Sequence, residues 1–266
     1  MTIYNKQEIA EVLGIPVFST NNDYVDNYEE ISQTHLDALK ETGHNPFMDT
    51  KSWEELGFST KELIEKYQVK KGKILDVGVG LGRLLSSTNI DMEKFGMDIS
   101  LPYLKQASKL NIECCMSMIE DMPYKKELFD VVVSTDVLEH VLDINLAVKN
   151  IFSVLKKGGI FILRVPYKED LQAYLTEDCP YKYVHLRNFD EHTLICLFEK
   201  IFDFKVIEWQ TVGFVEAEQY LKVKPFPYNK YLGKITRWYY NQWKKKDIKT
   251  YKSFYEKTEI NMIIRK

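Results

Sequence analysis

The sequence predicts an α/β fold with a mostly parallel central sheet, helices on both of its faces, and further helices ahead of it. Three observations predict this. Apolar runs alternate with helical segments from residue 73 onward, and strands separated by helices form βαβ units. A glycine-rich turn follows the first apolar run. The 266 residues, 45% of them hydrophobic, are enough to bury a core without disulfides or metals.

Seven short apolar runs are the expected strands, and the segments between several of them have helical patterns. The strands are expected at 73–77, 95–97, 112–116, 129–134, 160–165, 205–209 and 259–265, and the helices at 101–110, 145–155 and 191–201.

Residues 1–70 are polar and have a helical pattern. Apolar residues recur at helical spacing from Tyr24 to Leu39, and a second helix is expected at 53–67. We therefore predict an N-terminal helical extension over 1–70, covering the carboxyl edge of the sheet as a substrate cap, followed by one domain over 71–266.

An insertion over 213–257 interrupts the alternation before the last strand. Between 221 and 252 it carries ten Lys or Arg, a single acid and many aromatic residues. Three interpretations stay open: a lid over the carboxyl edge of the strands, a surface for anionic lipid or a phosphorylated glycan precursor, or a solvated basic face. The acidic N-terminal helices can pair with it within one chain or between two, which leaves a homodimer open.

Composition and termini narrow the class of protein. A net charge of -3 disfavours a nucleic-acid partner. The N-terminus lacks the pattern of a signal peptide, and no apolar run approaches the ~20 residues of a membrane span. A cytoplasmic protein without stable membrane insertion is expected.

The most informative segment joins the first strand to a helix. It reads Lys73-Ile74-Leu75-Asp76-Val77-Gly78-Val79-Gly80-Leu81-Gly82-Arg83. Glycines are needed where a backbone turns sharply and comes close to a ligand. The dinucleotide fingerprint G-x-G-x-x-G would need glycine where Arg83 stands, and a pyrophosphate would lie poorly beside Asp76.

Asp98 ends the second expected strand, eighteen residues after Gly80. A carboxylate at this point can accept hydrogen bonds from both hydroxyls of a ribose. The alternative is a cap for the helix that begins near Leu101, since Asp98 and Ser100 are both cap formers.

The arrangement Asp76-x-Gly78-x-Gly80-x-Gly82 resembles the S-adenosylmethionine (SAM) motif of class I methyltransferases. The resemblance implies a doubly wound, seven-stranded, Rossmann-like sheet whose last strand is antiparallel. It implies SAM as the cofactor and S-adenosylhomocysteine as the product. Asp76 would then help to hold the ammonium group of SAM, and Asp98 its ribose.

Further segments extend the resemblance to about residue 208. Residues 117–124 look like the loop that holds adenine, with Met118 where many relatives carry an acid. The other cofactor contacts that the resemblance implies are Ile99, Ile119, Glu120 and Thr135.

Residues 129–141 look like the fourth strand and the active-site segment, including the Leu138-Glu139-His140 of the small-molecule branch. Neither the Asn/Asp-Pro-Pro-Tyr/Phe motif nor the Pro-Cys nucleophile of nucleic-acid methyltransferases is present here. A small-molecule acceptor is therefore favoured.

Methyl transfer to a hydroxyl needs a general base. His140 and His185 are the catalytic candidates, although His140 can equally be a helix residue that bonds a carbonyl. Tyr167, Tyr181, Tyr183 and Arg187 are the expected substrate contacts. A magnesium site at Asp136, Glu139 and His140 is not supported by spacing, so no metal is expected.

These observations predict a SAM-dependent methyltransferase whose acceptor is a hydroxyl oxygen on a sugar, a nucleotide sugar or another metabolite. The alternatives are methyl transfer to nitrogen or carbon of a small molecule or peptide, a SAM-binding protein without turnover, and an NAD-dependent oxidoreductase.

Overall fold

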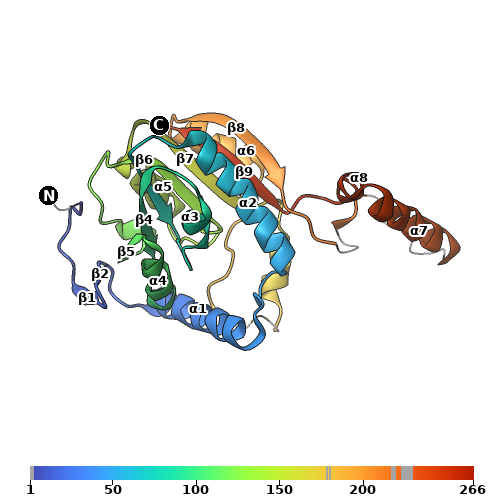
Figure 1. Ribbon diagram of the computed structural model, residues 1–266, viewed down its shortest axis with the longest axis horizontal. Coiled ribbons are helices and arrows are strands. Elements are labelled where there is room, and N and C mark those ends of the chain that lie inside the picture. Colours follow the sequence, from blue (N-terminus) through green and yellow to red (C-terminus); the bar gives the residue numbers. More distant parts are fainter. Residues whose placement is uncertain (1–2, 178, 180, 217–219, 223–229) are drawn as a thin grey trace.

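A nine-stranded sheet forms the centre of the molecule in the computed structural model, which describes residues 3–177, 179, 181–216, 220–222 and 230–266 (Figure 1). Its strand order is β1-β2-β5-β4-β3-β6-β7-β9-β8. The strands are β1 (Ala10–Val12), β2 (Ile15–Val17), β3 (Gly72–Val77), β4 (Met92–Asp98), β5 (Glu113–Met116), β6 (Phe129–Thr135), β7 (Leu155–Pro166), β8 (Lys205–Val212) and β9 (Glu259–Arg265).

The seven expected strands are all present, and those from β3 to β7 are parallel to one another. β9 is antiparallel to both β7 and β8, which confirms the expected antiparallel last strand. The strand count was too low by two, because β1 and β2 lie in a region that we expected to be helical. Ile15 and Val17 are buried there, and Val17 pairs with Met116 at the outer edge of β5.

Eight α-helices are described, and Figure 1 shows α7 and α8 apart from the sheet that the others accompany. They are α1 (Asp23–Thr42), α2 (Thr50–Tyr67), α3 (Arg83–Ser87), α4 (Leu101–Ala107), α5 (Ile144–Val154), α6 (Glu191–Ile195), α7 (Lys230–Lys246) and α8 (Ile248–Lys252). Short 3-10 turns cover Ser108–Leu110, Ile119–Asp121 and Leu171–Leu175, and a π-helical turn at Cys196–Ile201 continues α6.

Two apolar layers cover the two faces of the sheet. On one face Ile151 of α5 and Leu194 of α6 belong to the same core cluster as Leu75. On the other, Ile64 of α2 and Leu104 of α4 pack in a cluster with Ile74. Adjacent residues of β3 thus point to opposite faces, as strand geometry requires, and the doubly wound α/β arrangement is confirmed.

The segment that contains α7 and α8 projects from the side of the domain (Figure 1). The expectation that this insertion covers the carboxyl edge of the strands is therefore wrong for α7 and α8. Its aromatic residues pack on one another instead, around Tyr240, Tyr251 and Tyr255. Phe226 and Tyr228 lie outside the described residues. No helix of the described chain is long and apolar enough to cross a membrane.

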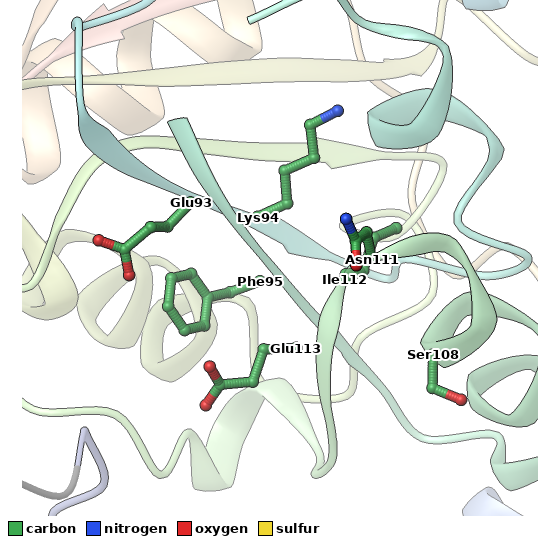
Figure 2. A pocket seen from close by; sticks show the side chains of 7 residues that line it. All are labelled: Glu93, Lys94, Phe95, Ser108, Asn111, Ile112 and Glu113. Carbon is green, nitrogen blue, oxygen red and sulfur yellow. The ribbon is translucent and has the colours of Figure 1, made fainter. Parts of the chain in front are cut away.

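A shallow depression lies at the amino ends of the parallel strands, opposite their carboxyl edge. Figure 2 shows the side chains that line it, from the beginnings of β4 and β5 and the turn between α4 and β5: Glu93, Lys94, Phe95, Ser108, Asn111, Ile112 and Glu113. Open α/β sheets bind ligands at the carboxyl ends of their strands. The functional site is therefore expected at the carboxyl edge.

Candidate active site

The glycine loop after β3 has left-handed backbone at all three glycines, with φ of 81° at Gly78, 50° at Gly80 and 73° at Gly82. A Cβ at Gly78 would lie 2.2 Å from Val137 Cγ2, and one at Gly82 would lie 2.9 Å from Ile112 Cδ1. These two glycines are required by packing. A Cβ at Gly80 would meet no described atom within 4 Å, so Gly80 is the glycine that faces open space.

Asp98 lies beside this loop. Its Oδ2 accepts a hydrogen bond from the Gly80 N–H at 2.9 Å, and its Oδ1 accepts from the Ser100 N–H at 2.9 Å. Burial raises the pKa of Asp98, while the N–H groups of Ser100, Gly80 and Ile99 oppose the rise. The cap of α4 is the Ser100 hydroxyl, so the carboxylate of Asp98 is not needed as the helix cap.

Asp76 is 2% exposed, and its Oδ1 has no hydrogen-bond partner within the described chain. Burial raises its pKa well above the usual value, and the Asp98 carboxylate adds to the rise while the Arg164 guanidinium opposes it. A buried carboxylate oxygen without a partner is unfavourable. The cationic ammonium of SAM would satisfy it, so the residues present fit that cofactor.

The expected adenine loop is held by the N-terminal segment. The Met118 N–H donates to Ser19 Oγ at 2.9 Å, and Asn22 Nδ2 donates to Met118 Sδ at 3.6 Å. Glu120 Oε1 accepts from the N–H groups of Leu142 and Asp143 at 3.1 and 3.2 Å. Glu120 thus joins this loop to the segment after β6. Sequence analysis missed Ser19 and Asn22, because nothing local indicates that they contact this loop.

Ile119 is buried in the core. Ile99 directly follows β4 and Thr135 ends β6, and both are half-buried. Ile99 and Thr135 lie at the carboxyl edge of the sheet, where the cofactor is expected. The contacts of all three residues with the cofactor remain predictions.

The two candidate histidines lie together. The rings of His140 and His185 have centroids 4.4 Å apart and planes at 83°. Glu139, next to His140, has no exposed surface, and neither of its carboxylate oxygens has a hydrogen-bond partner among the described residues. Glu139 Oε1 lies 4.0 Å from His140 Nε2.

Burial changes the pKa values of this cluster. It lowers the pKa of His140 to about 3, with His185 adding to the effect and Asp136 opposing it. It raises the pKa of Glu139 well above its usual value, and the Asp136 carboxylate makes the next largest contribution to the rise. His140 is therefore neutral near pH 7 and can accept a hydrogen bond, but its lowered pKa makes it a weak base.

Each histidine is held at its Nδ1 atom. Tyr28 Oη of α1 lies 2.8 Å from His140 Nδ1, and Glu169 Oε2 lies 2.5 Å from His185 Nδ1. The Tyr174 hydroxyl donates to Glu169 Oε1 at 2.8 Å. Sequence analysis missed these three residues. For Tyr28, the helical spacing of apolar residues indicated a helix face that packs inward. The sequence carries no such signal for the other two residues.

An ion pair between a buried arginine and an exposed aspartate lies near the histidines. Arg164 is 4% exposed and donates to Asp136 through Nη2 at 2.5 Å and Nε at 3.3 Å. Its Nη1 donates to Thr60 Oγ1 of α2 at 3.1 Å. Glu259 of β9 is also buried, and burial raises its pKa, while Arg164 opposes the rise.

The four expected substrate residues do not all lie near the histidines. The Tyr183 ring faces Tyr24 of α1 at 5.1 Å, near His140, and Tyr181 is half-buried on the same loop. Arg187 donates to the carbonyls of Val141 and Leu142. The Tyr167 hydroxyl donates to Glu191 at 2.8 Å. Tyr183 is thus close to the histidines, whereas Arg187 and Tyr167 have partners in the protein.

The fold and the paired acids at two adjacent strand ends define a domain suited to a cationic, ribose-containing cofactor. Residues 75–163 match the family described as a methyltransferase domain. The domain is a class I, Rossmann-like methyltransferase domain.

Curated relatives match part of the chain. An uncharacterized protein of Methanocaldococcus jannaschii is 31% identical over 128 residues, covering 46% of this chain and 61% of the relative. Phosphoethanolamine N-methyltransferase 1 of Zea mays is 33% identical over 110 residues (38% and 22%). Ubiquinone biosynthesis O-methyltransferase of Pelagibacter ubique is 32% identical over 115 residues (40% and 47%). The chain thus spans less than two thirds of each relative.

Solved structures share the fold over most of the chain. A SAM-dependent methyltransferase of Thermotoga maritima, named as a possible histamine N-methyltransferase, has a TM-score of 0.57 and 19% identity, covering 91% of this chain and 99% of that one. The [4+2]-cyclase SpnF has a TM-score of 0.60 and 15% identity, covering 95% and 98%. At these identities the likeness shows the fold alone.

Proposed function

We propose that the protein is a SAM-dependent methyltransferase that methylates a hydroxyl oxygen of a small molecule, such as a sugar, a nucleotide sugar or another metabolite. One observation carries the proposal. The glycine loop with the unpartnered Asp76 oxygen lies at the same sheet edge as the segment that carries Glu139 and His140. This arrangement supports a cofactor site next to a group that could accept a proton.

On the cofactor side, Asp76 would face the ammonium group, Asp98 the ribose, and Gly80 would let the backbone approach the ligand. Met118, Ile119 and Glu120 belong to the loop proposed for adenine, with Ile99 and Thr135 beside it. When bound, SAM supplies a methyl group on a sulfonium that an acceptor atom can displace.

On the acceptor side, α1 and the 181–187 loop close over the histidines. Asn27 Nδ2 donates to the Tyr183 carbonyl at 3.2 Å, and Tyr24 Oη donates to the His140 carbonyl at 3.4 Å. This cover supports a small acceptor. The His185 imidazole, or that of His140 beside it, would take the proton of a hydroxyl. Because positioning supplies most of the rate in such a displacement, the cover also orients the acceptor.

The first test is calorimetric titration of the protein with SAM, S-adenosylhomocysteine and NAD. Micromolar binding of the first two and no response to NAD are expected. Binding of NAD alone, or of none of the three, would contradict the proposal.

The second test is formation of S-adenosylhomocysteine with a panel of hydroxylated acceptors. A chain that binds SAM but forms no product with any class of acceptor would be a SAM-binding protein without turnover. Product formed only with amine acceptors would move the reaction to nitrogen.

A further inference from the structure

The side chains of Glu139, His140 and His185 converge on one point. One potential ligand atom from each lies within 4.8 Å of the other two. The Glu139 carboxylate is completely buried, and neither of its oxygens has a hydrogen-bond partner in the part of the chain that is described. A buried carboxylate of this kind needs a proton or a cation to compensate it.

The second observation is how the two rings are held. Tyr28 occupies Nδ1 of His140, and Glu169 occupies Nδ1 of His185. Nε2 of His140 lies 4.0 Å from Glu139 Oε1, and the His140 ring also hydrogen-bonds the backbone of Val184. A carboxylate or hydroxyl on the far nitrogen is the usual support of a metal-binding histidine, because it sets the tautomer and the ring orientation.

The surrounding charges also favour a cation. The carboxylates of Asp136, Glu169 and Glu259 all act on Glu139. The buried cation among them, Arg164, pairs with Asp136 and not with Glu139. Acidic groups therefore outnumber the buried cation Arg164 around Glu139 in the described part of the chain.

We propose that Glu139, His140 and His185 bind one divalent transition-metal ion, of the class of Mn²⁺, Co²⁺ or Zn²⁺. Two imidazoles and one carboxylate are a donor set that such ions accept. The sequence-based expectation of no metal considered Asp136 in place of His185. Asp136 pairs with Arg164, and the third ligand comes from a distant loop.

Three protein ligands leave coordination positions open for water or for acceptor oxygens. A hydroxyl bound to such an ion is more acidic than a free one, and two adjacent oxygens can occupy two open positions. The inferred acceptor class is therefore a compound with neighbouring oxygens, such as a vicinal diol. This role of the ion rests on the proposed function, whereas binding of the ion does not.

The test is titration of the chelator-treated full-length chain with Co²⁺, followed by the visible absorption of the bound ion. Saturation at one Co²⁺ per chain is expected. The variants Glu139→Gln and His185→Gln should each weaken Co²⁺ binding at least about tenfold. The matched control is His192→Gln, because His192 is 82% exposed and lies 3.7 Å from the Glu191 carboxylate, outside the cluster. Its titration should equal that of the wild type.

Circular dichroism and binding of S-adenosylhomocysteine are measured on every variant. If Glu139→Gln fails to fold, His185→Gln, on an irregular loop, decides the question. Absence of a cobalt band, or a band that neither Glu139→Gln nor His185→Gln weakens, overturns the metal site. Binding of S-adenosylhomocysteine without cobalt leaves the proposed function standing. Cobalt binding without cofactor affinity supports the site and overturns the proposed function.

Discussion

The two halves of the candidate site are built in different ways. The cofactor half comes from β3, the loop after it and the end of β4, and its geometry depends largely on backbone conformation at three glycines. The acceptor half is assembled from α1, the segment after β6, the end of β7 and the loop that carries His185. A local motif can therefore specify binding of a cofactor, whereas an acceptor site needs the whole fold.

The halves also differ in electrostatics. The cofactor half has two carboxylates, Asp76 and Asp98, beside backbone N–H groups. The acceptor half concentrates buried acids around Arg164. Substitutions in the first half should change cofactor affinity, and those in the second should change stability or turnover.

The largest effect is expected for Arg164→Met, which leaves Asp136 and the buried Glu259 without their cation. Because the Asp136 side chain is 42% exposed, losing the hydrogen bonds of Arg164 to Asp136 and Thr60 should cost about 1.5–3 kcal/mol of unfolding free energy, measurable by urea denaturation. The exposed Arg265→Met should change it by less than about 0.5 kcal/mol. A loss at Arg164 no larger than that of the control would contradict this account.

The same variant has a pH signature. Without Arg164 the pKa of Glu259 in the folded state rises further above its usual 4.5, so the folded state binds more protons than the unfolded one. Stability then falls as pH rises above that value. The deficit relative to wild type should be larger at pH 7 than at pH 4; the reverse order would contradict the sign.

Asp98→Ala should weaken SAM binding by about 1.5–3 kcal/mol, or roughly 10–150-fold, because hydrogen bonds to a charged acceptor are lost. Calorimetry measures the change. Asp91→Ala, an exposed aspartate just before β4, is the control and should bind normally. An unchanged dissociation constant for Asp98→Ala would remove this residue from the site.

Asp76→Asn separates affinity from stability. SAM affinity should fall roughly tenfold with loss of the carboxylate charge. Since the pKa of Asp76 is raised in the folded state, its ionisation destabilises the protein at pH above 3.8. The ligand-free variant should therefore be more stable than wild type at pH 7, and this gain should vanish near pH 4. Lower stability with unchanged affinity would refute the assignment.

The smallest effect is expected for Tyr28→Phe, which removes the hydroxyl at His140 Nδ1. Turnover should fall about 2–10-fold, since one hydrogen bond contributes about 0.5–1.5 kcal/mol, while SAM affinity stays constant. Tyr67→Phe, whose hydroxyl donates to Glu208 away from the site, is the control. A change in SAM affinity with normal turnover would show that the halves are not separable.

The N-terminal strands and the arm of α7 and α8 show where sequence patterns are insufficient. β1 and β2 have three residues each, too few for a periodicity to be recognised. Aromatic and basic residues between 220 and 252 suit either a lid or a projecting arm. Only the packing of Tyr240 with Tyr251 and Tyr255 shows that these aromatic residues cover one another.

The sequence by itself determined the order of strands and helices from residue 73 onward, and it determined the glycine loop. It also located two acids, Asp76 near the end of β3 and Asp98 at the end of β4. These features depend on periodicity and on spacing over a few residues, where backbone geometry acts directly.

Tertiary structure alone decided that the His140 ring contacts the His185 ring, that Glu139 is buried beside them, and that Arg164 pairs with Asp136. Such contacts join segments that are far apart in the chain. The burial that shifts the pKa values of these residues exists only once the segments have packed together.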